Sequence, residues 1–190
     1  MRITESGLKG LLIIEPDIYR DQRGYFMETW NHERYSSYGI NDQFVQDNLS
    51  FSACGILRGL HFQNPRGQGK LVYVTLGEVF DVAVDIRAGS PTYGRWEGYY
   101  LSAENSRQLY IPEGFAHGFC VTSKDAVFVY KCNEYYSPSK EAGILWSDPE
   151  IGIKWPVEKP VLSEKDAKNP LLRDLNSSVI PRYGDSNEQS

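Results

Sequence analysis

The chain has 190 residues, of which 41% are hydrophobic and 24% are charged, and its formal net charge is −5. This size and composition are typical of a single soluble globular domain with a sizeable core. A net negative charge argues against general binding of nucleic acid or of anionic membranes. It leaves room for a local basic pocket that holds one phosphorylated ligand.

The cysteine content and the N-terminus indicate a cytoplasmic protein. The three cysteines, Cys54, Cys120 and Cys132, are odd in number and their spacing fits no zinc motif, so we expect reduced thiols. Residues 1–6 lack the apolar core of a signal peptide. No apolar run approaches the roughly 18 residues needed to cross a bilayer, so we expect no membrane contact.

Short apolar stretches separated by turn residues follow one another along most of the chain. Their spacing of roughly ten residues is typical of an antiparallel double sheet or jelly roll. No helical pattern alternates with them, so a parallel α/β sheet is not expected. The sequence therefore predicts an all-β fold with strands over residues 10–15, 25–30, 44–50, 70–75, 79–86, 94–101, 107–111 and 126–132.

A short helix is expected over residues 32–38, where Asn31 caps its start and Gly39 ends it. A second helix is expected over residues 167–175, interrupted by Pro170. The few helices should lie at the periphery of the sheets.

No internal repeat or long linker divides the chain. We therefore expect one domain over residues 1–180, followed by a loose polar tail over residues 181–190.

The stretch 55–71 gathers the residues with the clearest chemical potential. It contains Arg58, His61, Gln63 and Lys70, with strand-like sequence on both sides. Histidine is the side chain most easily used as a base near neutral pH, and a nearby lysine and arginine stabilise an anion or an enolate. Taken alone, His61 also fits a hydrogen-bonded core histidine, and Lys70 fits a solvated lysine at a strand end.

A second pattern, Pro112-x-Gly114-x-x-His117, resembles the second conserved motif of the cupin superfamily. The first motif of metal-binding cupins has two histidines separated by one residue, whereas here the matching place reads His61-Phe-Gln63. An amide is a poor ligand for transition metals. The resemblance therefore implies a cupin-type jelly roll with no metal.

Further blocks in the same order narrow the resemblance to one family. The chain is similar to dTDP-4-dehydrorhamnose 3,5-epimerases from about residue 3 to residue 176. That family inverts C3 and C5 of dTDP-4-dehydro-6-deoxy-α-D-glucose without a cofactor and so forms dTDP-4-dehydro-β-L-rhamnose. The blocks are residues 58–63, 69–72, 77–79, 81–87, 90–94, 112–119, 130–132 and 151–156.

The resemblance implies four residues with chemical roles. His61 is the implied base, Asp166 orients its imidazole, Lys70 stabilises the enolate oxygen, and Tyr130 is the acid on the opposite face of the sugar. Without the resemblance, Tyr130 would fit a packed strand tyrosine. Asp166 also completes a capping pattern with Ser163, and both roles are compatible.

The resemblance also implies a set of substrate contacts. Arg58 and His117 are implied to contact the sugar and the phosphates, and we further expect a hydrogen bond between His117 and Asp81. A family aromatic that stacks on thymine matches Tyr136. The remaining implied contact positions are Arg23, Glu28, Gln46, Asn48, Glu141 and Lys165.

Family members dimerise partly by exchanging N-terminal strands, so a homodimer is implied, with Arg23 and Glu28 reaching the partner's pocket. Three alternatives stay open at this point. The protein could epimerise only C3 of a related nucleotide-linked 4-keto sugar. It could instead be a metal-dependent cupin oxygenase or isomerase, or a sugar-binding jelly roll without catalysis.

Overall fold

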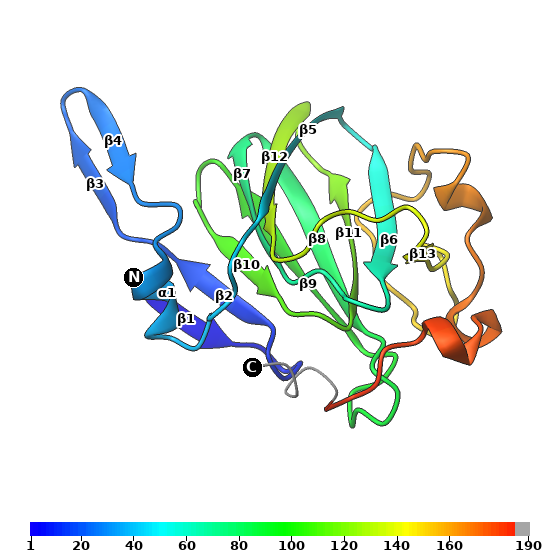
Figure 1. The fold of residues 1–190 in the computed structure, drawn as a ribbon. Helices are drawn as coiled ribbons and strands as arrows, with labels where there is room; N and C mark the ends of the chain where they lie inside the picture. The colour runs from blue at the N-terminus through cyan, green and yellow to red at the C-terminus, as the bar shows by residue number, and fades with distance from the viewer. Residues whose placement is uncertain (185–190) are drawn as a thin grey trace.

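The protein folds into two antiparallel sheets packed face to face, as a computed structural model of residues 1–184 shows (Figure 1). The order in the six-stranded sheet is β1 (Arg2–Glu5), β2 (Leu12–Glu15), β10 (Gln108–Ile111), β7 (Lys70–Leu76), β12 (Asp125–Cys132) and β5 (Gln46–Ala53). The order in the five-stranded sheet is β13 (Glu141–Gly143), β6 (Leu57–Gln63), β11 (Phe115–Val121), β8 (Glu78–Asp85) and β9 (Trp96–Ser102). The predicted all-β sandwich is confirmed.

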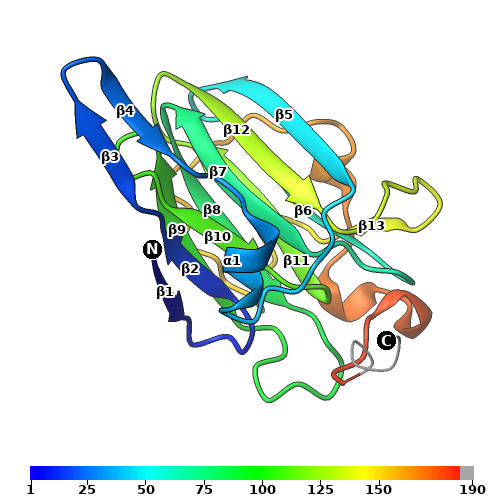
Figure 2. The same ribbon diagram turned by 60° about the vertical axis from the view of Figure 1, so that its left-hand side comes forward.

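The remaining elements are short. A two-stranded ribbon of β3 (Ile18–Asp21) and β4 (Gly24–Met27) extends away from the sandwich in both views (Figures 1 and 2). The helices are α1 (His32–Ser36) and three 3₁₀ turns, η1 (Asp166–Lys168), η2 (Leu172–Asp174) and η3 (Ser177–Val179). None of the helices within residues 1–184 is long and apolar enough to span a membrane.

Strand β8 (Glu78–Asp85) contributes to two cores, which explains why apolar residues occupy both of its faces. Val79 and Ala83 pack between the two sheets, whereas Val82 and Val84 face the opposite side of the five-stranded sheet. That outer side is covered by the C-terminal segment, including Ile151 and Leu172. A strand buried on both faces loses the usual apolar and polar alternation.

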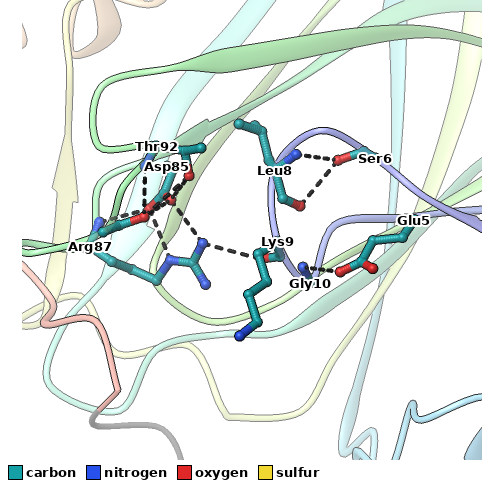
Figure 3. A network of polar contacts seen from close by, with 9 residues as sticks. Glu5, Ser6, Leu8, Lys9, Gly10, Asp85, Arg87 and Thr92 are labelled. Carbon is teal, nitrogen blue, oxygen red and sulfur yellow. Dashed lines mark hydrogen bonds and ion pairs between the residues drawn. The ribbon is translucent and has the colours of Figure 1, made fainter.

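A polar network joins the turn after β8 to the loop between β1 and β2 (Figure 3). The buried Asp85 accepts hydrogen bonds from Arg87 Nε at 2.9 Å, Ser90 Oγ at 2.5 Å and Thr92 Oγ1 at 2.6 Å. Arg87 Nη2 also donates to Lys9 O at 3.2 Å. Burial alone would raise the pKa of Asp85, but these donors hold it below its ordinary value.

The expected loose tail is wrong for its first residues. Ala88 N donates to Pro181 O at 2.8 Å, and Tyr183 N donates to Ala88 O at 3.0 Å. The Tyr183 ring also lies 5.0 Å from the Arg87 guanidinium, so this segment is fixed to the sandwich. Residues 185–190 of the expected tail lie outside the described residues.

Other boundaries also differ from the predictions. The strand expected over 25–30 ends at Met27, because Trp30 turns inward to pack on Tyr35 and Phe44, with ring centroids 4.6 Å apart in each case. The strand expected over 44–50 is Gln46–Ala53.

The first helix begins after Asn31, which accepts from Arg34 N as expected, but it ends at Ser36 rather than residue 38. The helix expected over 167–175 is instead two 3₁₀ turns, η1 and η2, on either side of Pro170. Proline lacks the N–H that a continuous helix needs there.

Candidate active site

A cavity of about 490 Å³ lies between the two sheets. One wall comes from the five-stranded sheet through β6 and β11, and the facing wall comes from the six-stranded sheet through β7 and β12. The C-terminal segment 161–166 borders it as well. Its lining includes most of the residues predicted for the site: Arg58, His61, Lys70, His117, Tyr130, Tyr136, Glu141, Lys165 and Asp166.

His61 and Asp166 form a hydrogen-bonded pair in this cavity. His61 Nε2 lies 2.6 Å from Asp166 Oδ1, and the histidine side chain remains 31% exposed. An ionised carboxylate only accepts hydrogen bonds, so Nε2 carries a proton, and the lone pair of the neutral imidazole is on Nδ1. The pairing therefore fixes the imidazole in a tautomer that is able to accept a proton at Nδ1.

Asp166 is itself held from two further directions. Its Oδ2 accepts from Gly59 N at 3.3 Å, and its backbone N donates to Ser163 Oγ at 3.0 Å. Burial raises the pKa of Asp166. The hydrogen bonds from His61 and the other donors lower it by more, so the pKa lies below its ordinary value. The Ser163 hydrogen bond and the pairing with His61 thus occur together, although η1 begins at Asp166 and its N-cap residue, Lys165, makes no side-chain cap.

Lys70 and Tyr130 come from the wall opposite His61. Lys70 is the first residue of β7, and Tyr130 lies on the neighbouring β12. Burial lowers the pKa of Lys70, and the nearby Cys132 and Asp81 partly oppose that shift. Burial raises the pKa of Tyr130, which keeps its phenol protonated. A cation and a proton donor thus face the histidine across the cavity.

His117 lies directly across from His61 in the pairing of β11 with β6. Its Nε2 lies 2.9 Å from Asp81 Oδ2, which confirms the expected hydrogen bond. Asp81 Oδ1 is buried and has no hydrogen-bond partner among residues 1–184. The His117 ring also stacks on Phe128 with centroids 6.0 Å apart.

The mouth of the cavity carries three polar residues in contact. Glu141 Oε2 accepts from Tyr136 OH at 2.8 Å and forms an ion pair with Lys165. Burial raises the pKa of Glu141, but these two donors bring it below its ordinary value. Arg58 is exposed, and its Nε donates to Ser52 Oγ at 3.0 Å.

Four of the predicted contacts do not line this cavity. Gln46 and Asn48 lie on β5 beside it, and Gln46 Oε1 accepts from Tyr136 N at 3.0 Å. Arg23 is at the tip of the β3–β4 ribbon, 86% exposed and paired with Asp21 at 2.5 Å. Glu28 follows the ribbon and pairs with Arg34 at 2.9 Å.

Several lining residues were not predicted from the sequence. Ser50 lies two residues beyond Asn48 on β5, so the strand period places both on one face. Its buried hydroxyl has no partner within residues 1–184. Phe119 and Phe128 stack in the wall with ring centroids 4.1 Å apart. Gln63 also lines the cavity, and the hydrogen bonds that occupy its amide are not predictable from spacing.

The arrangement suits proton transfer at a carbon next to a carbonyl group. A base held in one tautomer, a lysine to stabilise the enolate oxygen and a phenol on the facing wall are the groups that such a reaction needs. The arginine and the polar residues at the mouth suit a charged, extended substrate.

The model of one family, described as dTDP-4-dehydrorhamnose 3,5-epimerase, matches residues 5–174. The chain belongs to this family. A 3,5-epimerase of that name from Shigella flexneri is 56% identical over 178 residues, covering 93% of this chain and 98% of its own. A 3-epimerase from Streptomyces niveus is less similar, at 40% identity over 186 residues, covering 96% of this chain and 90% of its own.

A solved structure supports the same assignment. The dTDP-6-deoxy-D-glucose-3,5-epimerase of Legionella pneumophila, crystallised with dTDP-4-keto-L-rhamnose, superimposes with a TM-score of 0.94 at 53% identity. The match covers 96% of this chain and 98% of that one. The family's cupin-type sandwich is therefore the fold of this chain.

Proposed function

We propose that this protein is a dTDP-4-dehydrorhamnose 3,5-epimerase that converts dTDP-4-dehydro-6-deoxy-α-D-glucose to dTDP-4-dehydro-β-L-rhamnose. The observation that carries the residue roles is the His61–Asp166 pair on one wall, with Lys70 and Tyr130 on the facing wall. The product supplies dTDP-L-rhamnose for polysaccharide synthesis.

In the proposed mechanism, His61 Nδ1 removes the proton from C3, and the C–H electron pair forms a double bond to C4 while the ketone becomes an enolate. The Lys70 ammonium stabilises the enolate oxygen. Tyr130 then gives its phenolic proton to C3 from the opposite face, which inverts the carbon. The imidazolium and the phenolate return to their starting forms by exchange with water, and the same steps invert C5. Only protons move, so the reaction needs no redox cofactor.

The remaining residues in this proposal bind the substrate. Arg58 and His117 contact the sugar and the phosphates, since a guanidinium suits two phosphate oxygens at once. Tyr136 stacks on the thymine, and Glu141 with Lys165 borders the nucleotide at the mouth of the cavity. Gln46, which accepts from Tyr136 N and donates to Asn48 Oδ1, completes the nucleotide contacts together with Asn48.

The active form in this proposal is a homodimer, and the exposed apolar residues support it. Phe26 on the ribbon is 70% exposed, and Leu49 and Phe51 on the edge strand β5 are 68% and 60% exposed. Large apolar side chains on an unpaired edge favour association. The ribbon then carries Arg23 and Glu28 into the partner's pocket, which accounts for their distance from the cavity of their own chain.

Mixing two inactive variants tests this arrangement. Arg23→Ala and His61→Ala subunits are unfolded together, refolded and assayed. If Arg23 acts in the partner's pocket, each mixed dimer contains one complete site, so about a quarter of all sites recover. No recovery despite mixed-dimer formation, verified by native mass spectrometry, would show that Arg23 acts within its own chain.

We also place the enzyme in the cytoplasm, with residues 1–180 acting as one catalytic domain. The three cysteines support this location because all are free thiols in the fold, Cys120 and Cys132 buried and Cys54 exposed.

Incubation with dTDP-4-dehydro-6-deoxy-α-D-glucose in D₂O tests the reaction. Proton NMR should show deuterium at both C3 and C5 together with the L-rhamno product. Exchange and inversion at C3 alone would move the protein to the 3-epimerases, and no exchange at either carbon would refute the proposed function.

A further inference from the structure

The segment Glu134–Ser137, which carries Tyr136, lies between β12 and β13 and outside both strands. Instead of strand pairing, each of its residues has a backbone group bonded to a glutamine side chain. Gln68 Nε2 donates to Glu134 O at 2.9 Å, and Gln63 Nε2 donates to Tyr135 O at 3.3 Å. Tyr136 N donates to Gln46 Oε1 at 3.0 Å, and Ser137 N donates to Gln63 Oε1 at 2.9 Å.

Gln63 is the centre of this arrangement. Its side chain is buried, at 5% exposure, and both ends of its amide are used. The oxygen accepts from Ser137 N, while the nitrogen donates to Tyr135 O and, at 2.8 Å, to Arg66 O. Only an amide supplies a donor and an acceptor in this geometry, because a carboxylate lacks the donor.

The backbone of Gln63 also positions Glu141, the residue that accepts the hydrogen bond from the Tyr136 hydroxyl. Gln63 pairs with Glu141 between β6 and β13. The Glu141 carboxylate accepts from Tyr136 OH at 2.8 Å. The Gln63 side chain therefore holds the backbone on both sides of Tyr136, at Tyr135 and Ser137. The Tyr136 hydroxyl bonds Glu141, which is the β13 partner of Gln63.

We propose that Gln63, assisted by Gln68, is a positioning residue that holds Tyr136 in place to bind the nucleotide. The inference rests on the proposed function, since it assigns the nucleotide to Tyr136. A position that holds a metal ligand in other cupins here supports a substrate-binding loop. Ordering this loop in advance lowers the conformational cost of binding and leaves the chemistry at His61 unchanged.

Gln63→Met tests the role, because methionine has a similar length and lacks the amide. The KM for the nucleotide sugar and the calorimetric Kd for dTDP should each rise roughly tenfold, as expected when loop side chains must be ordered on binding. The kcat should stay within about twofold, since no group that touches the reacting carbons changes. Gln68→Met, which loses one bond, should raise both constants by about threefold.

Asn105→Leu is the matched control. Asn105 accepts from Ser102 N and Arg107 N and donates to Tyr100 O, so it too bonds three backbone groups, but in the turn after β9 and away from the cavity. It should lower the melting temperature without changing KM. In a Tyr136→Ala background, Gln63→Met should give no further rise in KM, because its effect passes through Tyr136.

The outcomes separate the two claims. If the wild type turns over the sugar and Gln63→Met has the same KM and Kd, the positioning role is wrong and the proposed function stands. An additive rise in the Tyr136→Ala background also overturns it. A wild type that neither binds dTDP nor turns over the sugar refutes the proposed function and the positioning role with it. If Gln63→Met fails to fold, the KM and the Kd for dTDP of Gln63→Glu and Gln68→Met are compared with those of the wild type instead.

Discussion

The inner part of the cavity and its mouth are built in different ways. Inside, His61, Lys70 and Tyr130 project from paired strands of both sheets. At the mouth, Tyr136 and Lys165 lie on irregular segments that side-chain contacts hold together. The comparison teaches that strands supply the fixed geometry that proton transfer needs, while the mouth is formed by loops whose order depends on individual hydrogen bonds.

This comparison predicts that variants inside the cavity reduce kcat and variants at the mouth raise KM. The largest effect is expected for His61→Ala, which removes the proposed base. The kcat should fall by about 10³-fold, within the range for loss of a general base, with a small change in KM. Steady-state kinetics of the coupled reaction measures it, and a variant that retained most of its kcat would assign the base to another residue.

Asp166→Asn should have the next largest effect, because an amide no longer fixes the proton on His61 Nε2. We expect a loss in kcat of roughly 10²-fold, somewhat below the loss of the base itself. Circular dichroism would confirm that the fold is retained. A change in KM alone would mean that the buried Asp166 acts in substrate binding and not in catalysis.

The same carboxyl predicts a dependence of stability on pH. Because the folded pKa of Asp166 is below its ordinary 3.8, its contribution to stability is present above that value and is lost as the pH falls through the folded pKa. The difference in unfolding free energy between wild type and Asp166→Asn should therefore shrink as the pH is lowered below 3.8. Urea unfolding at neutral and acidic pH measures this difference.

Lys70 should set the alkaline limit of activity. Burial lowers its pKa below the ordinary 10.5, and the lysine loses its positive charge as the pH rises through the lowered value. Activity should fall in that range, and Lys70→Arg should move the fall to higher pH because arginine stays protonated. An unchanged alkaline limb in the pH profile of Lys70→Arg would assign the limit to another group.

The smallest effect is expected at the mouth. Glu141→Gln removes the ion pair with Lys165 and weakens the contact with the Tyr136 hydroxyl. An exposed ion pair contributes little, so KM should rise by only about threefold to tenfold, with kcat retained. A larger loss in kcat than in KM would contradict the separation of the two regions.

The sequence predicted the residues inside the cavity better than the residues that hold them in place. The stretch 55–71 and the resemblance to the family together placed His61 and Lys70 at the site. The strand that begins at Lys70 followed from its apolar run, whereas β6, which carries His61, was not among the predicted strands. The residue pattern alone identified Asp166 only as part of a cap. Its contact with His61 joins residues 105 positions apart, and it forms only because the C-terminal segment folds back along β6.

Gln63 shows why the residues that hold the loop at the mouth were not predicted. Its replacement of a metal ligand was visible in the sequence, but its hydrogen bonds reach Tyr135 and Ser137, more than 70 positions away. A loop without a periodic pattern gives no signal of where its backbone groups find their partners. The ends of the strand after residue 25 were also missed, because the inward turn of Trp30 depends on packing against Tyr35.

The central claim is that His61 and Tyr130 act on opposite faces of the sugar, and deuterium exchange by Tyr130→Phe tests it most directly. Without the phenol, His61 still removes the protons and returns deuterium from its own side. The recovered substrate should be deuterated at C3 and C5 with its configuration unchanged. Continued inversion at both carbons, or loss of exchange with the fold intact, would contradict the assignment of His61 and Tyr130 to opposite faces.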